Sequence, residues 1–218
     1  IGIQSFEKLR KEGFLYVDKT KYIYELVDQG VYYFLSRPRR FGKSLLISTI
    51  EAYFQGKKEL FDGLAIQQEE KEWNSYPILH IDLNTANFRE EDSLYTLLND
   101  YLCQWESVYG TRSSENTLAL RFKGIIERAA EKEGRNVVIL IDEYDKPILQ
   151  TLRNPELQEK HRNQLKAFYS VLKTQDKYIK FAFITGVTKF GKVSVFSDLN
   201  NLTDISMDNR YVAICGLT

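Results

Sequence analysis

This chain of 218 residues has only two cysteines, only two histidines and no long apolar run. Its two cysteines, Cys103 and Cys215, show neither a disulfide framework nor the spacing of a metal site. His80 and His161 stand far apart in the sequence, and we expect structural roles for both. No apolar stretch approaches the roughly 18 residues that a membrane span needs, and no signal peptide is visible. These absences predict reduced thiols, no membrane segment and a cytoplasmic location.

The chain also lacks an excess of charge of either sign. It contains 30 Lys+Arg and 30 Asp+Glu, so its formal net charge is zero and nothing demands a nucleic-acid or membrane partner. A local basic cluster, Arg37, Arg39 and Arg40, could still bind phosphate. With 43% hydrophobic residues, no repeats and no low-complexity tract, residues 1–218 are expected to form one globular domain with a large core.

The triplet Gly42-Lys43-Ser44 is the most informative pattern present. An apolar run at 31–35 and a loop at 36–42 lead into it, and a helical pattern runs from Lys43 to about Gln55. Strand, Gly-Lys-Ser and helix form the layout of a phosphate-binding loop. In such a loop backbone N–H groups cradle the phosphates, the lysine reaches the β- and γ-phosphates, and the serine hydroxyl binds Mg²⁺.

This loop departs from the usual pattern at its entry. Arg37 stands where the first glycine is expected, and Pro38 follows with a fixed φ and no N–H donor. A basic surface turn before an ordinary helix is the alternative interpretation of the segment.

A second motif lies about 100 residues downstream. The apolar run 136–141 is typical of a strand buried on both faces of a parallel sheet, and it ends in Asp142-Glu143. Ligands bind at the carboxyl ends of such strands. An Asp there can hold the Mg²⁺ of a nucleotide, and an adjacent Glu can deprotonate the attacking water. A solvated acidic turn is the alternative, which the order and spacing of the two motifs disfavour.

A second Gly-x4-Gly-Lys pattern, Gly186 to Lys192, is interpreted differently. Val193 replaces the hydroxyl that would bind Mg²⁺, and the β-branched, Asn-rich residues 193–201 do not predict a helix. We therefore expect this segment to be a loop beside the site and not the phosphate cradle.

Apolar runs and helical patterns alternate along the chain. This alternation predicts an α/β fold of the P-loop NTPase type, with a mostly parallel five-stranded sheet and helices on both of its faces. Thr185 ends the fourth strand, beside the acidic one, where it could sense the γ-phosphate or hold the attacking water. The alternative for Thr185 is a structural role, in which its hydroxyl only forms hydrogen bonds with backbone groups at the end of the strand. The expected strands are 31–35, 77–83, 136–141, 178–185 and 202–207, and the expected helices are 20–29, 43–55, 91–109, 114–133 and 154–174.

Four segments together resemble the bacterial AAA-ATPase-like family across nearly the whole chain. The arginine-rich loop is the most specific of them, and in that family the missing first glycine is normal. The segments are Tyr16-Val17-Asp18-Lys19-Thr20, the loop from Phe34 to Ser44, Leu140-Ile141-Asp142-Glu143-Tyr144-Asp145-Lys146-Pro147, and Thr185 to Phe190.

The resemblance implies an AAA-like P-loop ATPase with an additional catalytic glutamate, using ATP and Mg²⁺. Glu143 would be the general base, Thr185 the strand-four sensor, and Ser44 and Asp142 the metal ligands. Many family members continue into a helical lid and a PD-(D/E)XK nuclease-like domain, and we expect neither within residues 1–218. The residues expected to hold the nucleotide are Arg37, Pro38, Arg39, Arg40, Phe41, Gly42, Lys43, Ser44 and Leu45.

Three functions remain open at this point. The leading hypothesis is Mg-dependent ATP hydrolysis that switches or drives an attached module. The alternatives are a regulatory module that binds nucleotide without hydrolysing it, and a small-molecule P-loop kinase, which Glu143 disfavours because it favours water activation. Nucleic acid is not implied by this domain, although a nuclease-like domain could bring it, and a homo-oligomer is compatible. No arginine finger can be assigned among the weak candidates Lys189, Lys192 and Arg210, so slow hydrolysis is expected.

Overall fold

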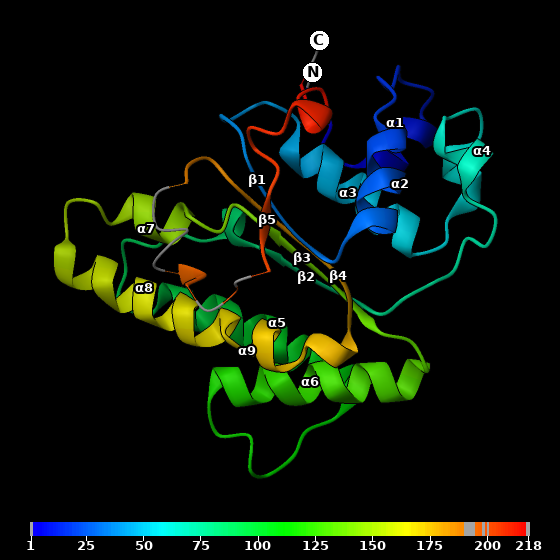
Figure 1. Cartoon of the computed structure of the whole chain (residues 1–218). Coiled ribbons are helices and arrows are strands. Elements are labelled where there is room, and N and C mark those ends of the chain that lie inside the picture. The colour runs from blue at the N-terminus through cyan, green and yellow to red at the C-terminus, as the bar shows by residue number, and fades with distance from the viewer. Residues whose placement is uncertain (1, 190–194, 198, 200, 217–218) are drawn as a thin grey trace.

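The computed structural model describes residues 2–189, 195–197, 199 and 201–216. At its centre lies a sheet of five parallel strands in the order β2-β3-β4-β1-β5 (Figure 1). All of them overlap the strands that the sequence predicts, which confirms the parallel α/β architecture. The strands are β1 (Tyr32–Ser36), β2 (Ile78–Asp82), β3 (Val137–Asp142), β4 (Ile179–Gly186) and β5 (Thr203–Asp204).

Helices cover both faces of this sheet (Figure 1). One face carries α1 (Phe6–Lys11), α2 (Thr20–Gln29), α3 (Lys43–Phe54) and α4 (Ile66–Glu69), and the other carries α5 (Ser93–Tyr109), α6 (Leu118–Glu133), α8 (Pro155–Tyr169) and α9 (Val171–Thr174). The short α7 (Lys146–Gln150) follows the end of β3. Within the described ranges, no helix combines the length and the apolar character needed to cross a membrane.

The alternation of side chains along β1 divides the core into two layers. Tyr33 and Leu35 pack in the layer under α1–α4, whereas Tyr32 and Phe34 pack in the layer under α5–α9. Every residue of β3 is buried, as the unbroken apolar run predicts for a central parallel strand.

Local chemistry explains several helix ends. The Asn154 side chain accepts a hydrogen bond from the Leu157 N–H, and Pro155 occupies the first turn of α8, as its sequence indicates. Gly134 ends α6 in the left-handed conformation at φ 63°. The helices α1 and α7 were not predicted, because α1 buries only Phe6 and Leu9 and α7 has five residues.

The strand order determines which loops meet. β4 pairs with β1 on one side and with β3 on the other, with Leu35 opposite Thr185 and Ile141 opposite Ile184. The loop after β1, the acidic turn after β3 and the end of β4 therefore converge at the carboxyl edge of the sheet, where ligands bind in open α/β folds.

Candidate nucleotide-binding site

The loop between β1 and α3 turns sharply into the helix. The Arg37 N–H donates to the Gly186 carbonyl at 3.1 Å, which ties the loop entry to the end of β4. Gly42 then adopts φ 83° and ψ 16°, a left-handed conformation that glycine accepts without strain, and α3 begins at Lys43. The first N–H groups of a 12-residue helix have no intrahelical acceptor, so they can bind an anion.

Lys43 joins this loop to the acidic turn. Its side chain is only 3% exposed, and its Nζ lies 2.9 Å from Glu143 Oε1. The same ammonium donates to the backbone carbonyls of Arg37 at 2.9 Å and Pro38 at 3.2 Å. An ammonium has three donors, so these three acceptors fix its position at the mouth of the loop.

Ser44, Asp142 and Thr185 form a hydrogen-bonded row. The Ser44 hydroxyl donates to Asp142 Oδ2 at 2.6 Å, and the Thr185 hydroxyl donates to Asp142 Oδ1 at 2.6 Å. Asp142 and Thr185 are both buried. The two motifs identified in the sequence are thus in direct contact through side chains 98 positions apart.

Glu143 adopts an unusual backbone conformation at the end of this row. Its φ is 57°, in the left-handed region, where a residue other than glycine is strained. The Glu143 N–H lies 3.3 Å from the Thr185 hydroxyl oxygen, which accepts its hydrogen bond. Burial raises the pKa of the Glu143 carboxyl, Asp142 and Asp145 add to this effect, and Lys43 opposes it.

The residues of the basic loop have different surroundings. The Arg37 guanidinium donates to the carbonyls of Ser36 and Ser206 and so links the loop to the segment after β5. The next four residues, Pro38, Arg39, Arg40 and Phe41, are exposed, and Leu45 is half-buried in the first turn of α3. Whether these side chains contact a nucleotide stays a prediction.

Asp145 is the polar residue whose role the sequence analysis missed. It is completely buried, and its carboxylate accepts hydrogen bonds from the N–H groups of Val187 and Thr188 and from the Thr188 hydroxyl. A further acidic residue three positions after Asp142, between Tyr144 and Lys146, was the available signal.

The arginine-finger candidates are already paired where the structure describes them. Lys189 Nζ lies 3.1 Å from Asp204 Oδ2, and the Arg210 guanidinium lies 2.7 Å from Asp208 Oδ2. Lys192 lies outside the described residues, as do residues 190 and 191 of the second Gly-x4-Gly-Lys pattern and Val193 after it. No finger is assigned.

The residues at this edge also suit Mg²⁺. Mg²⁺ takes oxygen ligands and is usually held by one or two carboxylates, several waters and the phosphates of the substrate. Ser44 and Asp142 offer a hydroxyl and a carboxylate oxygen only 2.6 Å apart. Over the described part of the chain, no group of three or more His, Cys, Asp or Glu residues could hold a metal ion by itself.

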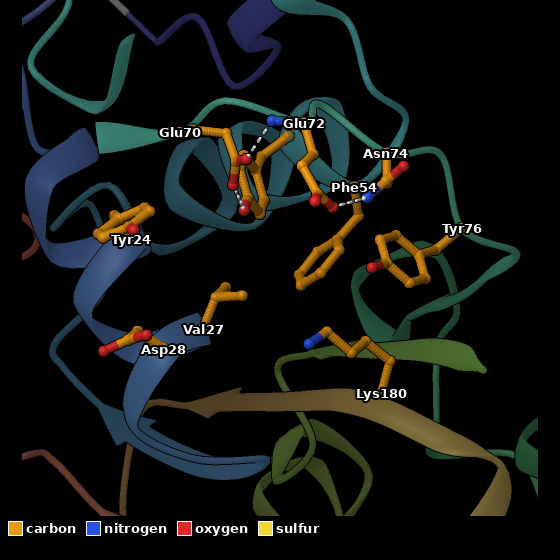
Figure 2. A pocket seen from close by; sticks show the side chains of 10 residues that line it. Tyr24, Val27, Asp28, Phe54, Glu70, Glu72, Asn74, Tyr76 and Lys180 are labelled. Carbon is orange, nitrogen blue, oxygen red and sulfur yellow. Dashed lines mark hydrogen bonds between the residues drawn. The ribbon is translucent and has the colours of Figure 1, made fainter. Parts of the chain in front are cut away.

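A cavity of about 210 Å³ lies at the opposite edge of the sheet, near the start of β4 (Figure 2). Lys180 points into it from the strand, below Phe54 and Tyr76. Two of its carboxylates already have partners, since Glu70 accepts from the Tyr53 hydroxyl and Glu72 accepts from the Asn74 amide at 2.7 Å. We interpret these groups as part of the packing between α2, α3 and the segment 70–76.

Fold and site together define a P-loop NTPase-like domain. The family model described as "Predicted AAA-ATPase" matches residues 1–196, and the chain therefore belongs to this family. A protein of Azotobacter chroococcum mcd 1, "Uncharacterized protein in vnfD 5'region", is 43% identical over 219 residues, which cover 100% of this chain and 42% of that protein. The chain thus spans less than half the length of this curated relative. No solved structure matches it.

Proposed function

We propose that this domain binds Mg-ATP at the loop 37–45 and hydrolyses it with Glu143 as the general base. The observation that carries the proposal is the continuous set of contacts from Lys43 and Ser44, through Asp142 and Thr185, to Glu143. Family membership supports nucleotide binding. The energy of binding or hydrolysis would switch or drive an attached module.

Each residue has a distinct task in this proposal. The N–H groups at the start of α3 and the Lys43 ammonium would bind the phosphates, with the γ-phosphate replacing Glu143 as a partner of Lys43. Ser44 and Asp142 would hold Mg²⁺, which neutralises charge on the β- and γ-phosphates when bound. Thr185 would orient Asp142 and the backbone of Glu143, because it contacts both.

Glu143 is suited to accept a proton from water. Burial raises the pKa of its carboxyl, which makes the carboxylate a stronger base than an exposed one. Transfer of Lys43 to a phosphate would also remove the cation that opposes this rise. The base therefore becomes stronger when the substrate is in place, provided that the carboxylate stays ionised.

Phosphate release from ATP, measured with and without a hydroxyl acceptor, tests the proposal. An ATPase releases phosphate at the same rate in both conditions. ADP formation that requires the acceptor and releases no free phosphate would indicate a kinase, and tight ATP binding without turnover would indicate a regulatory module.

Hydrolysis by the 218-residue chain is expected to be slow. A finger supplied in trans is worth about 10³–10⁵ in turnover in related chemistry, and both described candidates, Lys189 and Arg210, already pair with carboxylates. The rate per molecule should therefore rise with protein concentration if a second copy supplies a basic residue. A fast rate that is independent of concentration, in a protein shown to be monomeric, would contradict this expectation.

Asp142→Asn should weaken the Mg²⁺-dependent part of ATP binding. The amide keeps the shape of the side chain but removes its charge, and changes around a metal typically cost about 10–100-fold in metal affinity. Calorimetric titrations with ATP, in Mg²⁺ and in a chelator, measure the difference. If Mg²⁺ raised the ATP affinity of the wild type and of the variant by the same factor, Asp142 would be excluded from the metal site.

A further inference from the structure

The turn that carries Glu143 is bound to the start of the segment that follows β4. The Asp145 carboxylate receives the Val187 N–H at 3.1 Å, the Thr188 N–H at 2.8 Å and the Thr188 hydroxyl at 2.9 Å. The structure assigns to Asp145 the role of a positioning residue, which holds this segment against the turn and thereby places the general base. The inference rests on the proposed function.

The Asp145 carboxylate forms its hydrogen bonds with this segment and not with α7, the helix that follows it in the sequence. Asp145 precedes α7 as its N-cap residue, a place where Asp usually accepts a hydrogen bond from the first turn. Here the side chain makes no such bond. A buried carboxylate is costly unless it is well hydrogen-bonded, and the donors of Val187 and Thr188 supply those bonds. Helix capping therefore does not explain this residue.

Close packing at Gly186 supports the same role. A Cβ on Gly186 would lie 2.5 Å from the Tyr144 ring and 3.0 Å from Asp145 Oδ1, so a larger residue would push the two segments apart. Tyr144 adds two further links, because its N–H donates to the Thr185 carbonyl at 2.9 Å and its hydroxyl donates to the Thr188 carbonyl at 3.1 Å. The turn and the end of β4 thus form one hydrogen-bonded unit.

The backbone of Glu143 shows why such a unit is needed. A left-handed conformation in a residue other than glycine costs about 1–3 kcal/mol and persists only where the surroundings enforce it. Thr185 holds the N–H of Glu143 on one side. Asp145 anchors the same turn two residues later. Loss of that anchor should let the turn relax and move the carboxylate of Glu143 away from its place beside Lys43.

Asp145→Asn tests the inference, because the amide keeps the volume but removes the charge and one of the two oxygens that accept from the Val187 N–H. We expect kcat for ATP hydrolysis to fall about 10–100-fold, since a misplacement of about 1 Å can cost 10²-fold. The Kd for Mg-ATP should change less than about threefold, because Lys43 and Ser44 remain in place. Amide hydrogen exchange at Val187 and Thr188, measured by NMR, should accelerate, because a neutral amide oxygen accepts their hydrogen bonds more weakly than the carboxylate does.

Two further variants separate positioning from loss of stability. Thr188→Val removes one of the donors and should lower kcat less than Asp145→Asn does, with a less than additive effect in the double variant. Tyr32→Phe is the control, because it removes hydroxyl contacts with the Leu172 carbonyl and Asp176 far from the turn. It should lower the melting temperature and leave kcat unchanged.

The outcomes distinguish this inference from the proposed function. Wild-type kcat in Asp145→Asn would overturn the positioning role, as would a fall in kcat that Tyr32→Phe reproduces. A wild-type protein that binds ATP without hydrolysing it would overturn the proposed hydrolysis instead. In that case exchange at Val187 and Thr188 still decides whether Asp145 holds the segment, and unchanged exchange in Asp145→Asn would overturn that as well.

Discussion

Lys43→Ala should abolish detectable binding of Mg-ATP. The ammonium lies at the start of α3, held by the carbonyls of Arg37 and Pro38 and by Glu143, at the place where a β- or γ-phosphate would meet it. Alanine removes the only described cation at this position and leaves the loop with N–H donors alone. Calorimetry at micromolar protein concentrations should show no heat of binding for the variant and a clear isotherm for the wild type.

The same substitution affects the fold in a specific way. Lys43 is buried, yet the contacts of its ammonium are polar, so its removal leaves two carbonyls and the Glu143 carboxylate without their donor. An unsatisfied buried acceptor costs about 1–3 kcal/mol, so the melting temperature should fall although the fold persists. Glu143 can limit the loss by binding a proton.

A matched control is available for Lys43. Lys160 also pairs with a carboxylate, Glu91 at 2.7 Å, but it lies exposed on α8. Lys160→Ala should retain the ATP affinity of the wild type. Equal affinity for ATP in Lys43→Ala and the wild type would remove residues 36–44 from the nucleotide site and favour the alternative of a basic surface turn.

The sequence was sufficient to predict the parts of the site that follow from local pattern. An apolar run before Gly42-Lys43-Ser44 predicts a strand, a turn and a helix, and the structure has all three. The run that ends in Asp142 predicts a central buried strand, which β3 is. Strands and long helices are predictable because apolar residues recur along the sequence with the period of the element that buries them.

The contacts between these parts could not be predicted in the same way. Whether Lys43 reaches Glu143 depends on the order β3-β4-β1, which places one strand between the two motifs. The left-handed backbone of Glu143 has no sequence signal, because glutamate is not a residue that favours φ above zero. It arises from contacts with residues of β4 that are more than 40 positions away.

The hydrogen-bond partners of Asp145 could not be predicted from the sequence for the same reason. An acidic residue directly before a short helix is normally interpreted as a cap, and only the three-dimensional structure shows its carboxylate facing Val187 and Thr188. Polar residues buried by such long-range contacts can therefore be recognised from the sequence as unusual, but their partners cannot be named.

Glu143→Gln should bind ATP with an affinity close to that of the wild type and hydrolyse it about 10²–10⁴-fold more slowly. The amide keeps the size of the side chain and loses the ability to accept a proton, and general-base catalysis contributes a factor of that order. The ion pair with Lys43 becomes a weaker hydrogen bond from the ammonium to an uncharged amide, which makes the ammonium more available to a phosphate. Any change in affinity should therefore be a modest increase, and the loss should appear in kcat alone.

Single-turnover phosphate release measures the chemical step, and calorimetry measures the affinity independently. Glu70→Gln is a suitable control, because Glu70 is also hydrogen-bonded and partly buried but lines the cavity at the opposite edge of the sheet. It should hydrolyse ATP at the wild-type rate. If Glu143→Gln did so too, Glu143 would not be the general base, and its ion pair with Lys43 would then serve only to hold the phosphate loop against the acidic turn.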